Sequence, residues 1–394
     1  MSKFMMLLYL TYIVLIVPIS VNEQTTIYLS TLLSVVFIIF SLLDLKGRKY
    51  NKQEKNVVAL VILYTIASLA SSLVFYSYAL VFTLNKVIPL IIFISFIGKN
   101  NYYNLKLSAL YKFVFYMTNF IIICSLIIFL FGYSGIRYSS GRLLLVPTSE
   151  FLYSFGEPRL FWIFTHKSRF ALFCTLNLGM LLIRKDMGNY QRGILVLLTL
   201  MASYFSSTKT ILAINIAIAS IYYFKQKSED KRSNYLKASI VAFCLVIVVW
   251  LGNSFINSLS NVRDVESAGG RIYIWEAGIK KVYNNFYGIG QFDQFNWLTT
   301  PKLPGGIYTH AHNIFINELI ERGVIPGSLY ILIYFSIIKL FNKRFINIIF
   351  IGCALSGVMD NTISSEMPYI FWPIIFLLYA YSNYNRDNGD EVYY

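Results

Sequence analysis

Long apolar runs alternate with short polar segments along almost the whole chain. Several runs reach the roughly 20 residues that an α-helix needs to cross about 30 Å of hydrocarbon. The first run is also compatible with a signal peptide, but it lacks a small-residue cleavage site, so we expect a span there. The pattern predicts about twelve membrane spans, which lie at 4–21, 26–45, 57–76, 80–97, 110–131, 169–184, 192–207, 209–224, 237–254, 325–341, 345–359 and 369–383.

The charges of the short polar segments predict the side of the membrane on which each one lies. Cytoplasmic loops of membrane proteins carry an excess of Lys and Arg. If the N-terminus is cytoplasmic, every inside segment is basic, and most of the short outside segments are nearly free of Lys and Arg. The inside segments are then 46–56, 98–109, 185–191, 225–236 and 342–344. Both termini are therefore expected in the cytoplasm.

The composition supports an all-α polytopic membrane protein that forms one integral membrane domain over residues 1–394. Hydrophobic residues make up 57% of the chain, whereas charged residues make up only 13%. The net charge of +15 does not indicate nucleic-acid binding, because the basic residues are scattered among loops. The four cysteines lie within apolar runs and are expected to act as small hydrophobic residues: Cys124, Cys174, Cys244 and Cys353.

Two predicted outside segments, 132–168 and 255–324, are too long to be simple turns. Together they contain all three histidines and many basic residues. Long outside loops escape the charge rule, so this basic content is allowed but needs another explanation. The ionisable side chains therefore predict a chemical site on the outer face, in the segment 255–324.

The first part of this segment, "GGRIYIWEAGIKKVYNNFYGIG", predicts a short helix that starts after flexible glycines. We expect this helix to end at Gly288 and Gly290. Its apolar face is predicted from residues at helical spacing, namely Ile272, Trp275, Ile279 and Val282.

The later part, "AHNIFINELIERG", predicts a second amphipathic helix. Glu318 and Arg322 have the i,i+4 spacing of a salt bridge, and Gly323 suits the residue after the helix. The expected apolar side consists of Ile316, Leu319 and Ile320. Together the two helices predict a re-entrant cap of short helices over the membrane surface.

His312 stands at the start of the second predicted helix, and Arg271 stands at the start of the first. An imidazole that titrates near neutrality suits a general base, and a guanidinium suits a phosphate or pyrophosphate group. Structural alternatives remain open for both residues. His312 is also placed to cap its helix, Arg271 to face lipid headgroups, and Glu318 is better explained as a salt-bridge partner than as an acid.

Three motifs carry a resemblance to the O-antigen polymerase and O-antigen ligase superfamily of bacterial inner-membrane glycosyltransferases. The segment "GGRIYIWEAGIKKVYNNFYGIG" resembles a family motif in which an Arg is followed by a Trp and then, after a short helix, by Gly-x-Gly. The segment "HAHNIFINELIERGVIPG" resembles its His-Asn motif followed by a helix and a glycine-containing turn. The turn "SSTKT" (206–210) resembles its Ser-x-Ser-Arg turn. These motifs cover 45 residues, about a ninth of the chain.

The motifs depart from the family pattern at several positions. Lys209 replaces a frequent Arg, which keeps the charge but loses the bidentate fork. The ligase pattern is followed up to Gly323, but Pro326 takes its final place and Gly327 comes one residue later. The Arg-ten residues-Gly signature of some polymerases is absent from the sequence of both outer segments.

The resemblance implies an all-helical fold of the GT-C class and a metal-independent sugar transfer on the outer face of the inner membrane, with no cofactor. The donor would be a glycan on undecaprenyl pyrophosphate, and a chain-length regulator protein is a further candidate partner. His312 would activate the acceptor hydroxyl, while Arg271 and Lys209 would hold the pyrophosphate. The other candidate substrate-binding residues are Asn313, His310, Arg169 and Arg159.

Among the functions considered, a polymerase that joins lipid-linked repeat units of O-antigen or capsular polysaccharide is favoured. The first alternative is a ligase that moves finished glycan onto lipid A-core. A flippase for lipid-linked oligosaccharide is the alternative of another class. A flippase should carry charged residues within its spans, along the path of its substrate. The predicted spans are almost free of charged residues, with Lys86 as the exception. A structural scaffold would not need histidines and arginines gathered at one outer site.

Overall fold

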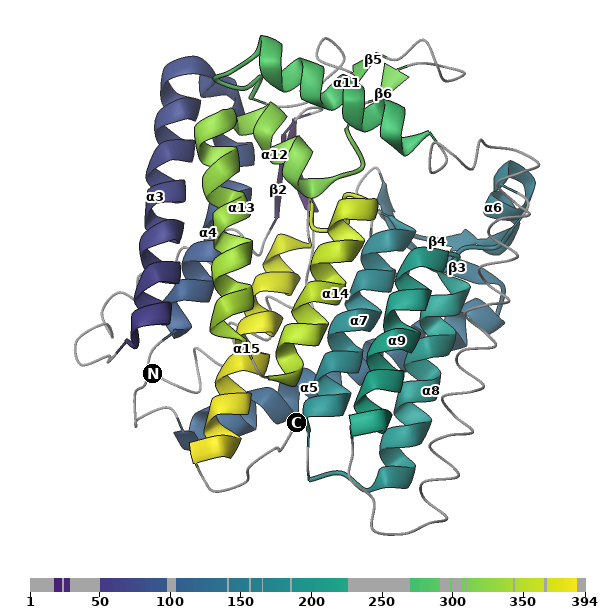
Figure 1. The fold of residues 1–394 in the computed structure, drawn as a ribbon. Coiled ribbons are helices and arrows are strands. Elements are labelled where there is room, and N and C mark those ends of the chain that lie inside the picture. The colour runs from purple at the N-terminus through teal and green to yellow at the C-terminus, as the bar shows by residue number, and fades with distance from the viewer. Residues whose placement is uncertain are drawn as a thin grey trace. The chain divides into compact units, whose positions relative to one another are not determined.

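Helices dominate the described part of the chain, and its strands are short (Figure 1). Among the predicted spans, 237–254 and most of 4–21 and 26–45 lie outside the described residues. The computed structural model describes residues 18–22, 25–28, 50–97, 104–139, 142–155, 157–164, 166–184, 186–225, 270–290, 298–299, 307–308, 310–342, 344–364 and 367–387.

The remaining predicted spans coincide with helices to within a few residues. The longest helices, α3 and α5, begin several residues earlier than predicted because polar residues extend their first turns. The observed bounds are α3 (Lys52–Phe75), α4 (Leu80–Phe96), α5 (Asn104–Leu130), α7 (Lys167–Ile183), α8 (Asn189–Phe205), α9 (Lys209–Lys225), α13 (Val324–Leu340), α14 (Phe345–Met359) and α15 (Pro368–Asp387).

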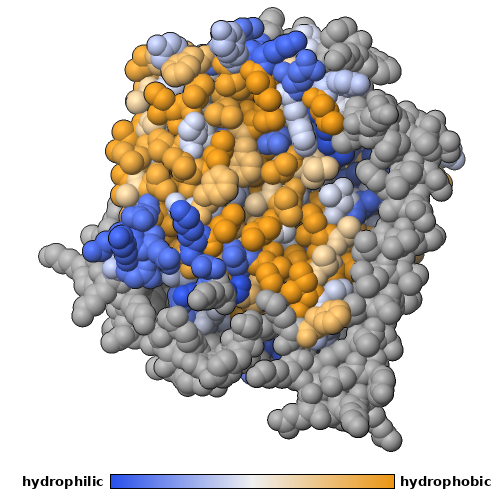
Figure 2. All heavy atoms as spheres, viewed as in Figure 1, coloured by the Kyte–Doolittle hydropathy of each residue, from blue (hydrophilic) through white to orange (hydrophobic). Residues whose placement is uncertain are grey.

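Two of these helices are both long enough and apolar enough to cross a membrane, namely α3 and the stretch Leu107–Leu130 of α5. Shorter apolar helices cover Ser77–Ile91, Lys209–Phe224, Val324–Leu340 and Phe345–Met359. The exposed surface of α3 agrees with a membrane-embedded protein, because most of its exposed side chains are apolar. On α3 the exposed side chains include Ile62, Leu63, Ile66, Leu73 and Val74. Figure 2 shows apolar residues over the part of the surface that this helix forms.

The prediction that the chain is wholly α-helical is wrong in detail, because three short antiparallel hairpins occur. The first pairs β1 (Pro18–Asn22) with β2 (Thr25–Tyr28), where the ends of two helical spans were predicted. β-branched residues such as Ile19, Val21 and Thr26 favour extended backbone there. The other pairs are β3 (Tyr133–Ser139) with β4 (Arg142–Pro147) and β5 (Leu298–Thr299) with β6 (Ile307–Tyr308).

The chain divides into two compact units, and each is described by itself. The first unit draws on Met1–Asn104, Ser258–Asn342 and Gly357–Phe376, and the second on Leu105–Asn257, Lys343–Ser356 and Leu377–Tyr394.

In the first unit, α3 packs against α4 and α13. Asn51 and Glu54 form a reciprocal capping box that satisfies the free backbone N–H groups at the start of α3. Two short helices, α11 (Arg271–Asn284) and α12 (Ile314–Arg322), lie at one end of this bundle, as Figure 1 shows. The two short helices predicted from the sequence are therefore present, and their place over the membrane surface stays a prediction.

In the second unit, α7 packs against α8 and α9. Buried polar side chains join these helices to α5: the side chain of Asn177 donates to Thr199 Oγ1 at 3.0 Å and accepts from Thr118 Oγ1 at 2.7 Å. Such bonds stabilise helix packing where water is absent. The hairpin β3–β4 and the short helix α6 (Thr148–Phe155) lie within 132–168, the first long segment predicted to be outside.

Candidate functional site

The turn that carries His312 is fixed from both sides. Asn313 is the N-cap of α12, and its Oδ1 accepts hydrogen bonds from the N–H groups of Phe315 at 2.9 Å and Ile316 at 3.1 Å. On the other side, the N–H of Ala311 donates to Asn317 Oδ1 at 2.7 Å. His312 therefore does not cap the helix, which was the structural alternative for this residue.

The backbone of His312 has φ of 50°, in the left-handed region that a non-glycine residue rarely adopts. The flanking hydrogen bonds hold this conformation. Backbone strain of this kind often occurs at functional positions, so the geometry is consistent with a chemical role for His312.

The carboxylate of Asp360 lies beside the imidazole of His312. Nδ1 of His312 and Oδ1 of Asp360 are 3.3 Å apart, and the two side chains are 30% and 20% exposed. If the proton of the neutral imidazole is on Nδ1, this N–H donates a hydrogen bond to the carboxylate. Nε2 then keeps the lone pair that a general base needs. The ring of His310 lies 4.2 Å from that of His312, centroid to centroid.

The sequence reasoning missed Asp360, which directly follows α14. A signal for it was available: the predicted topology places the segment after span 345–359 on the same outer side as His312. An acidic residue at that span end is a natural partner for an outer histidine.

Helix α11 packs against the His312 turn through Gly278. A Cβ atom at this position would come within 2.8 Å of Ile316 Cγ2 and 3.5 Å of Ala311 Cβ, so only glycine permits this approach. The predicted apolar face of α11 is partly wrong, because Ile272 and Ile279 are exposed, whereas Ile274 and Gly278 are buried. Contact with α12, rather than residue spacing alone, selects the buried face.

Arg271 is the first residue of α11, as predicted, and it follows Gly270, whose φ is 85°. The side chain of Arg271 is intermediate in exposure. Arg271 thus begins α11 and His312 directly precedes the N-cap of α12, and these two helices belong to the same unit and contact each other.

The glycines expected to end α11 have another role. The helix ends at Asn284, and Gly288 and Gly323 then lie backbone to backbone, both with φ of 92°. The N–H groups of Ile289 and Gly290 donate to the carbonyls of Ile320 and Glu321 at 2.9 Å each. This segment therefore caps the C-terminal carbonyls of α12.

Charged residues occupy the buried side of α12. Glu318 and Arg322 form the predicted i,i+4 pair, with Oε1 and Nε 3.9 Å apart, and both side chains are buried. Lys86 of α4 lies 2.7 Å from Glu318 Oε2 and 2.5 Å from Glu321 Oε2. The hydroxyl of Tyr64 donates to Glu318 Oε1 at 2.6 Å.

The apolar side predicted for α12 is only partly correct. Ile320 is buried as expected, but Ile316 and Leu319 are only partly buried. The buried polar residues of α12 include Glu318, and the pKa of Glu318 reflects its surroundings. Burial raises this pKa, but the charges of Lys86 and Arg322 and the hydrogen bonds from Lys86 and Tyr64 hold it below its ordinary value. Glu318 is therefore ionised at neutral pH and is not poised to act as an acid.

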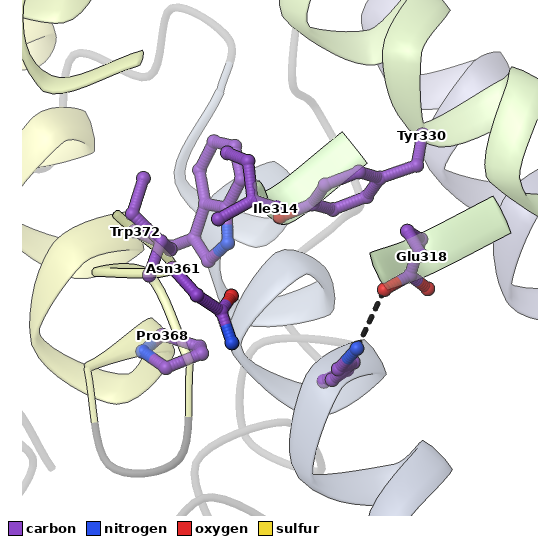
Figure 3. A pocket seen from close by; sticks show the side chains of 8 residues that line it. Ile314, Glu318, Tyr330, Asn361, Pro368 and Trp372 are labelled. Atoms are coloured by element: carbon purple, nitrogen blue, oxygen red, sulfur yellow. Dashed lines mark hydrogen bonds and ion pairs between the residues drawn. The ribbon is translucent and has the colours of Figure 1, made fainter. Parts of the chain in front are cut away.

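A small cavity lies beside this cluster (Figure 3). The space open to the centre of a water molecule is about 10 Å³, which suits about one water and is too small for a sugar. Figure 3 shows the side chain of Glu318 on one side and those of Asn361 and Trp372 on the other. The cavity is lined by Lys86, Ile314, Glu318, Tyr330, Asn361, Ile363, Pro368 and Trp372.

The second unit gathers other predicted binding residues around the turn between α8 and α9. The Lys167 side chain donates to the carbonyl of Ser207 at 3.1 Å, and Ser207 Oγ donates to the carbonyl of Pro158 at 3.0 Å. Arg159 and Lys167 both lie within 4 Å of Glu157, at 3.7 and 3.8 Å. Burial lowers the pKa of Arg159, and the charge of Glu157 partly offsets this effect.

Lys209 is the first residue of α9, directly after this turn, and Arg169 lies in the first turn of α7, which His166 caps. The structure thus brings Arg159 and Lys167 to the turn that precedes Lys209. His312, His310, Asn313 and Arg271 belong to the first unit and these cations to the second.

The described residues contain no group of three or more His, Cys, Asp or Glu side chains arranged to hold a metal ion. Free cysteines Cys174 and Cys353 are buried within helices, as expected for small hydrophobic residues, and Cys244 lies outside the described residues.

The described residues thus combine apolar helices, which are typical of a membrane-embedded protein, with a cluster of ionisable side chains in the first unit. Residues 193–332, about a third of the chain, match the sequence family described as O-antigen ligase. The match covers α9, α11 and α12, and it confirms the resemblance to the O-antigen ligase and polymerase superfamily of membrane-embedded, glycosyltransferase-like enzymes of bacteria. A search of curated proteins gave no match.

Proposed function

We propose that this protein is a polysaccharide polymerase of the bacterial inner membrane, with both termini in the cytoplasm and a GT-C-like fold. It joins oligosaccharide repeat units carried on undecaprenyl pyrophosphate at the outer face. The observation that carries this proposal is the His312 turn, in which Asn313, Asn317 and Asp360 together fix one imidazole at the head of α12.

In the proposed reaction, a hydroxyl oxygen of the acceptor repeat unit attacks the anomeric carbon of the donor glycan. Nε2 of His312 accepts the hydroxyl proton as the new carbon–oxygen bond forms. The bond between the anomeric carbon and the pyrophosphate oxygen breaks, and its electron pair leaves with undecaprenyl pyrophosphate. No metal ion is needed for this step if protein cations stabilise the leaving group.

Arg271 and Lys209 are the cations proposed to bind that pyrophosphate, with Arg159 and Arg169 as additional candidates. Guanidinium groups bind phosphate oxygens through two parallel hydrogen bonds, whereas ammonium groups act as point charges. Asn313 and His310 would contact the sugar beside His312.

Ligation is the second candidate function, because the matched family is described as O-antigen ligase. The departure from the ligase pattern at residues 326 and 327 weakens the ligase assignment. Pro326 lies in the first turn of α13, where the missing backbone N–H costs little. Gly327 packs against Leu319, and a Cβ atom added to Gly327 would lie 2.8 Å from the Cα atom of Leu319. The glycine that permits close packing is thus displaced by one residue from the ligase pattern.

A strain that lacks the native gene provides the test. Wild-type protein should restore a ladder of polymer lengths, and His312→Ala should abolish it, because loss of a general base costs about 10²- to 10⁴-fold. His310→Ala should have a smaller effect, because its position before the capped turn is less constrained. A normal ladder from His312→Ala at wild-type expression would remove this base from the mechanism.

Purified protein separates the two candidate functions. With lipid-linked repeat units as both donor and acceptor, a polymerase should form longer lipid-linked glycans. With lipid A-core as the only added acceptor, a ligase should transfer the glycan and a polymerase should not. The neighbouring genes give an independent indication: a repeat-unit cluster with a flippase gene favours the polymerase, and a core-oligosaccharide cluster favours the ligase.

A further inference from the structure

Lys86 lies within α4, one of the helices that match a predicted membrane span, and neither the family motifs nor the proposed chemistry uses it. Its side chain is only 15% exposed and touches two carboxylates of α12. A charge within a membrane span is costly and usually has a function. The contacts of Lys86 indicate what that function is.

Lys86 completes a neutral cluster of four charges. The cations are Lys86 and Arg322, and the carboxylates are Glu318 and Glu321. Because these groups are buried, removal of one cation would leave one negative charge without compensation. An uncompensated buried charge is strongly unfavourable, whereas a buried pair can be replaced by neutral groups at little cost.

The cluster attaches α12 to the two helices that pack beside it. Tyr64 of α3 donates to Glu318, and an Arg322 guanidinium nitrogen donates to Thr83 of α4. Ser71 of α3 donates to the carbonyl of Arg322 at 3.2 Å. These directional bonds hold α12 in one position on α3 and α4.

The position of α12 also sets the position of His312. Asn313 caps α12, and Asn317 of α12 accepts the hydrogen bond from Ala311, so the histidine turn moves with the helix. The contact between His312 and Asp360, at 3.3 Å, is already long for a hydrogen bond. A small displacement of α12 would therefore break this alignment.

We propose that Lys86 is a positioning residue for the reaction at His312, and that it acts through the charge balance of α12. This inference rests on the proposed function. It assigns Lys86 no contact with substrate. It explains why a lysine is present within a span that carries no other charged side chain.

The experiment compares four variants of the full chain in lipid nanodiscs, with lipid-linked repeat units as substrate. Lys86→Met removes the cation, and Lys86→Arg keeps it. The double variant Lys86→Met/Glu321→Gln restores neutrality, because Glu318 and Arg322 remain. The control Lys86→Met/Glu276→Gln removes a carboxylate at Glu276, which is exposed on α11 and pairs with Lys280.

We expect Lys86→Met to lower kcat by about a hundredfold with little change in KM, because misalignment of reacting groups has an effect of this size. Lys86→Arg should retain most of the rate. The neutral double variant should recover at least about tenfold over Lys86→Met, as expected for coupled neighbouring groups. The control with Glu276→Gln should recover nothing.

Hydrogen exchange of the α12 amides gives a readout that does not depend on catalysis. Exchange should be faster in Lys86→Met and should return toward wild type in the neutral double variant. Equal exchange rates of the α12 amides in Lys86→Met and wild type would overturn the inference. A double variant with no more catalytic activity than Lys86→Met would also overturn it. If Lys86→Met does not fold, a folded and active double variant supports the inference, and a folded but inactive one refutes it.

The two proposals fail in different ways. If His312→Ala is fully active, the proposed base is wrong, whatever the exchange of α12 shows. If His312→Ala is inactive and Lys86→Met changes exchange but not kcat, only the positioning role of Lys86 is refuted.

Discussion

Gly288 and Gly323 lie so close that a Cβ atom on Gly288 would be 2.6 Å from the backbone nitrogen of Gly323. Each has φ of 92°, and their contact joins the segment after α11 to the end of α12. The two glycine motifs recognised in the sequence are therefore one structural feature, and its role is to hold the helix that follows His312.

This contact predicts that Gly288→Ala and Gly323→Ala destabilise the protein. Both the positive φ and the lack of space oppose a side chain, so we expect a loss of about 1–3 kcal/mol or more in unfolding free energy. The matched control is Gly193→Ala in α8, where an added Cβ meets nothing within 4 Å. That variant should be as stable as wild type or more stable, by up to about 1 kcal/mol. Thermal unfolding of the detergent-solubilised protein measures the difference, and equal midpoints for all three variants would contradict it.

Asp360→Asn should lower polymerisation without loss of expression. An amide cannot stabilise the imidazolium that forms on His312, and it does not favour one tautomer as a carboxylate does, so we expect a decrease of at least about tenfold. The control is Asp186→Asn, because Asp186 belongs to the second unit and pairs there with Arg184 and Lys112. The measurement is the initial rate on lipid-linked repeat units. An unchanged rate in Asp360→Asn would show that the contact with His312 is incidental.

Arg271 and Lys209 should respond differently to conservative substitution if both bind one anionic group. Arg271→Lys should impair activity because a point charge does not replace a bidentate fork, whereas Lys209→Arg should be tolerated. Lys280→Ala provides a control on α11, where Lys280 is 74% exposed. Donor affinity can be measured by titration of undecaprenyl pyrophosphate. Full activity in Arg271→Ala would remove this residue from the site.

The predicted topology can be tested by cysteine labelling from outside intact spheroplasts. Tyr153 in the first outer segment and Tyr283 in the second are highly exposed, so Tyr153→Cys and Tyr283→Cys should react with a membrane-impermeant reagent. Tyr190 is also highly exposed but lies in a predicted inside segment, so Tyr190→Cys should react only after permeabilisation. Protection of either outer position, or labelling of position 190 from outside, would refute this arrangement.

The sequence by itself determined the local properties of this protein. Apolar runs predicted the positions of nine described helices, since helix formation in an apolar environment depends mainly on a continuous stretch of suitable residues. These helices are α3, α4, α5, α7, α8, α9, α13, α14 and α15. Local signals also located α11, α12 and the pair formed by Glu318 and Arg322. A motif of adjacent residues singled out His312 as the candidate base.

Only the tertiary structure decided which distant groups meet. Asp360 lies 48 positions after His312 and Lys86 lies 232 positions before Glu318, so no spacing rule could pair them. Helix packing also selected the buried face of α11 and placed charges, rather than isoleucines alone, on the buried side of α12. The physical reason is that the spacing of apolar residues predicts only which face of a helix is shielded from water. Buried charges, in contrast, need partners of opposite charge or hydrogen-bond partners, and other helices supply these partners.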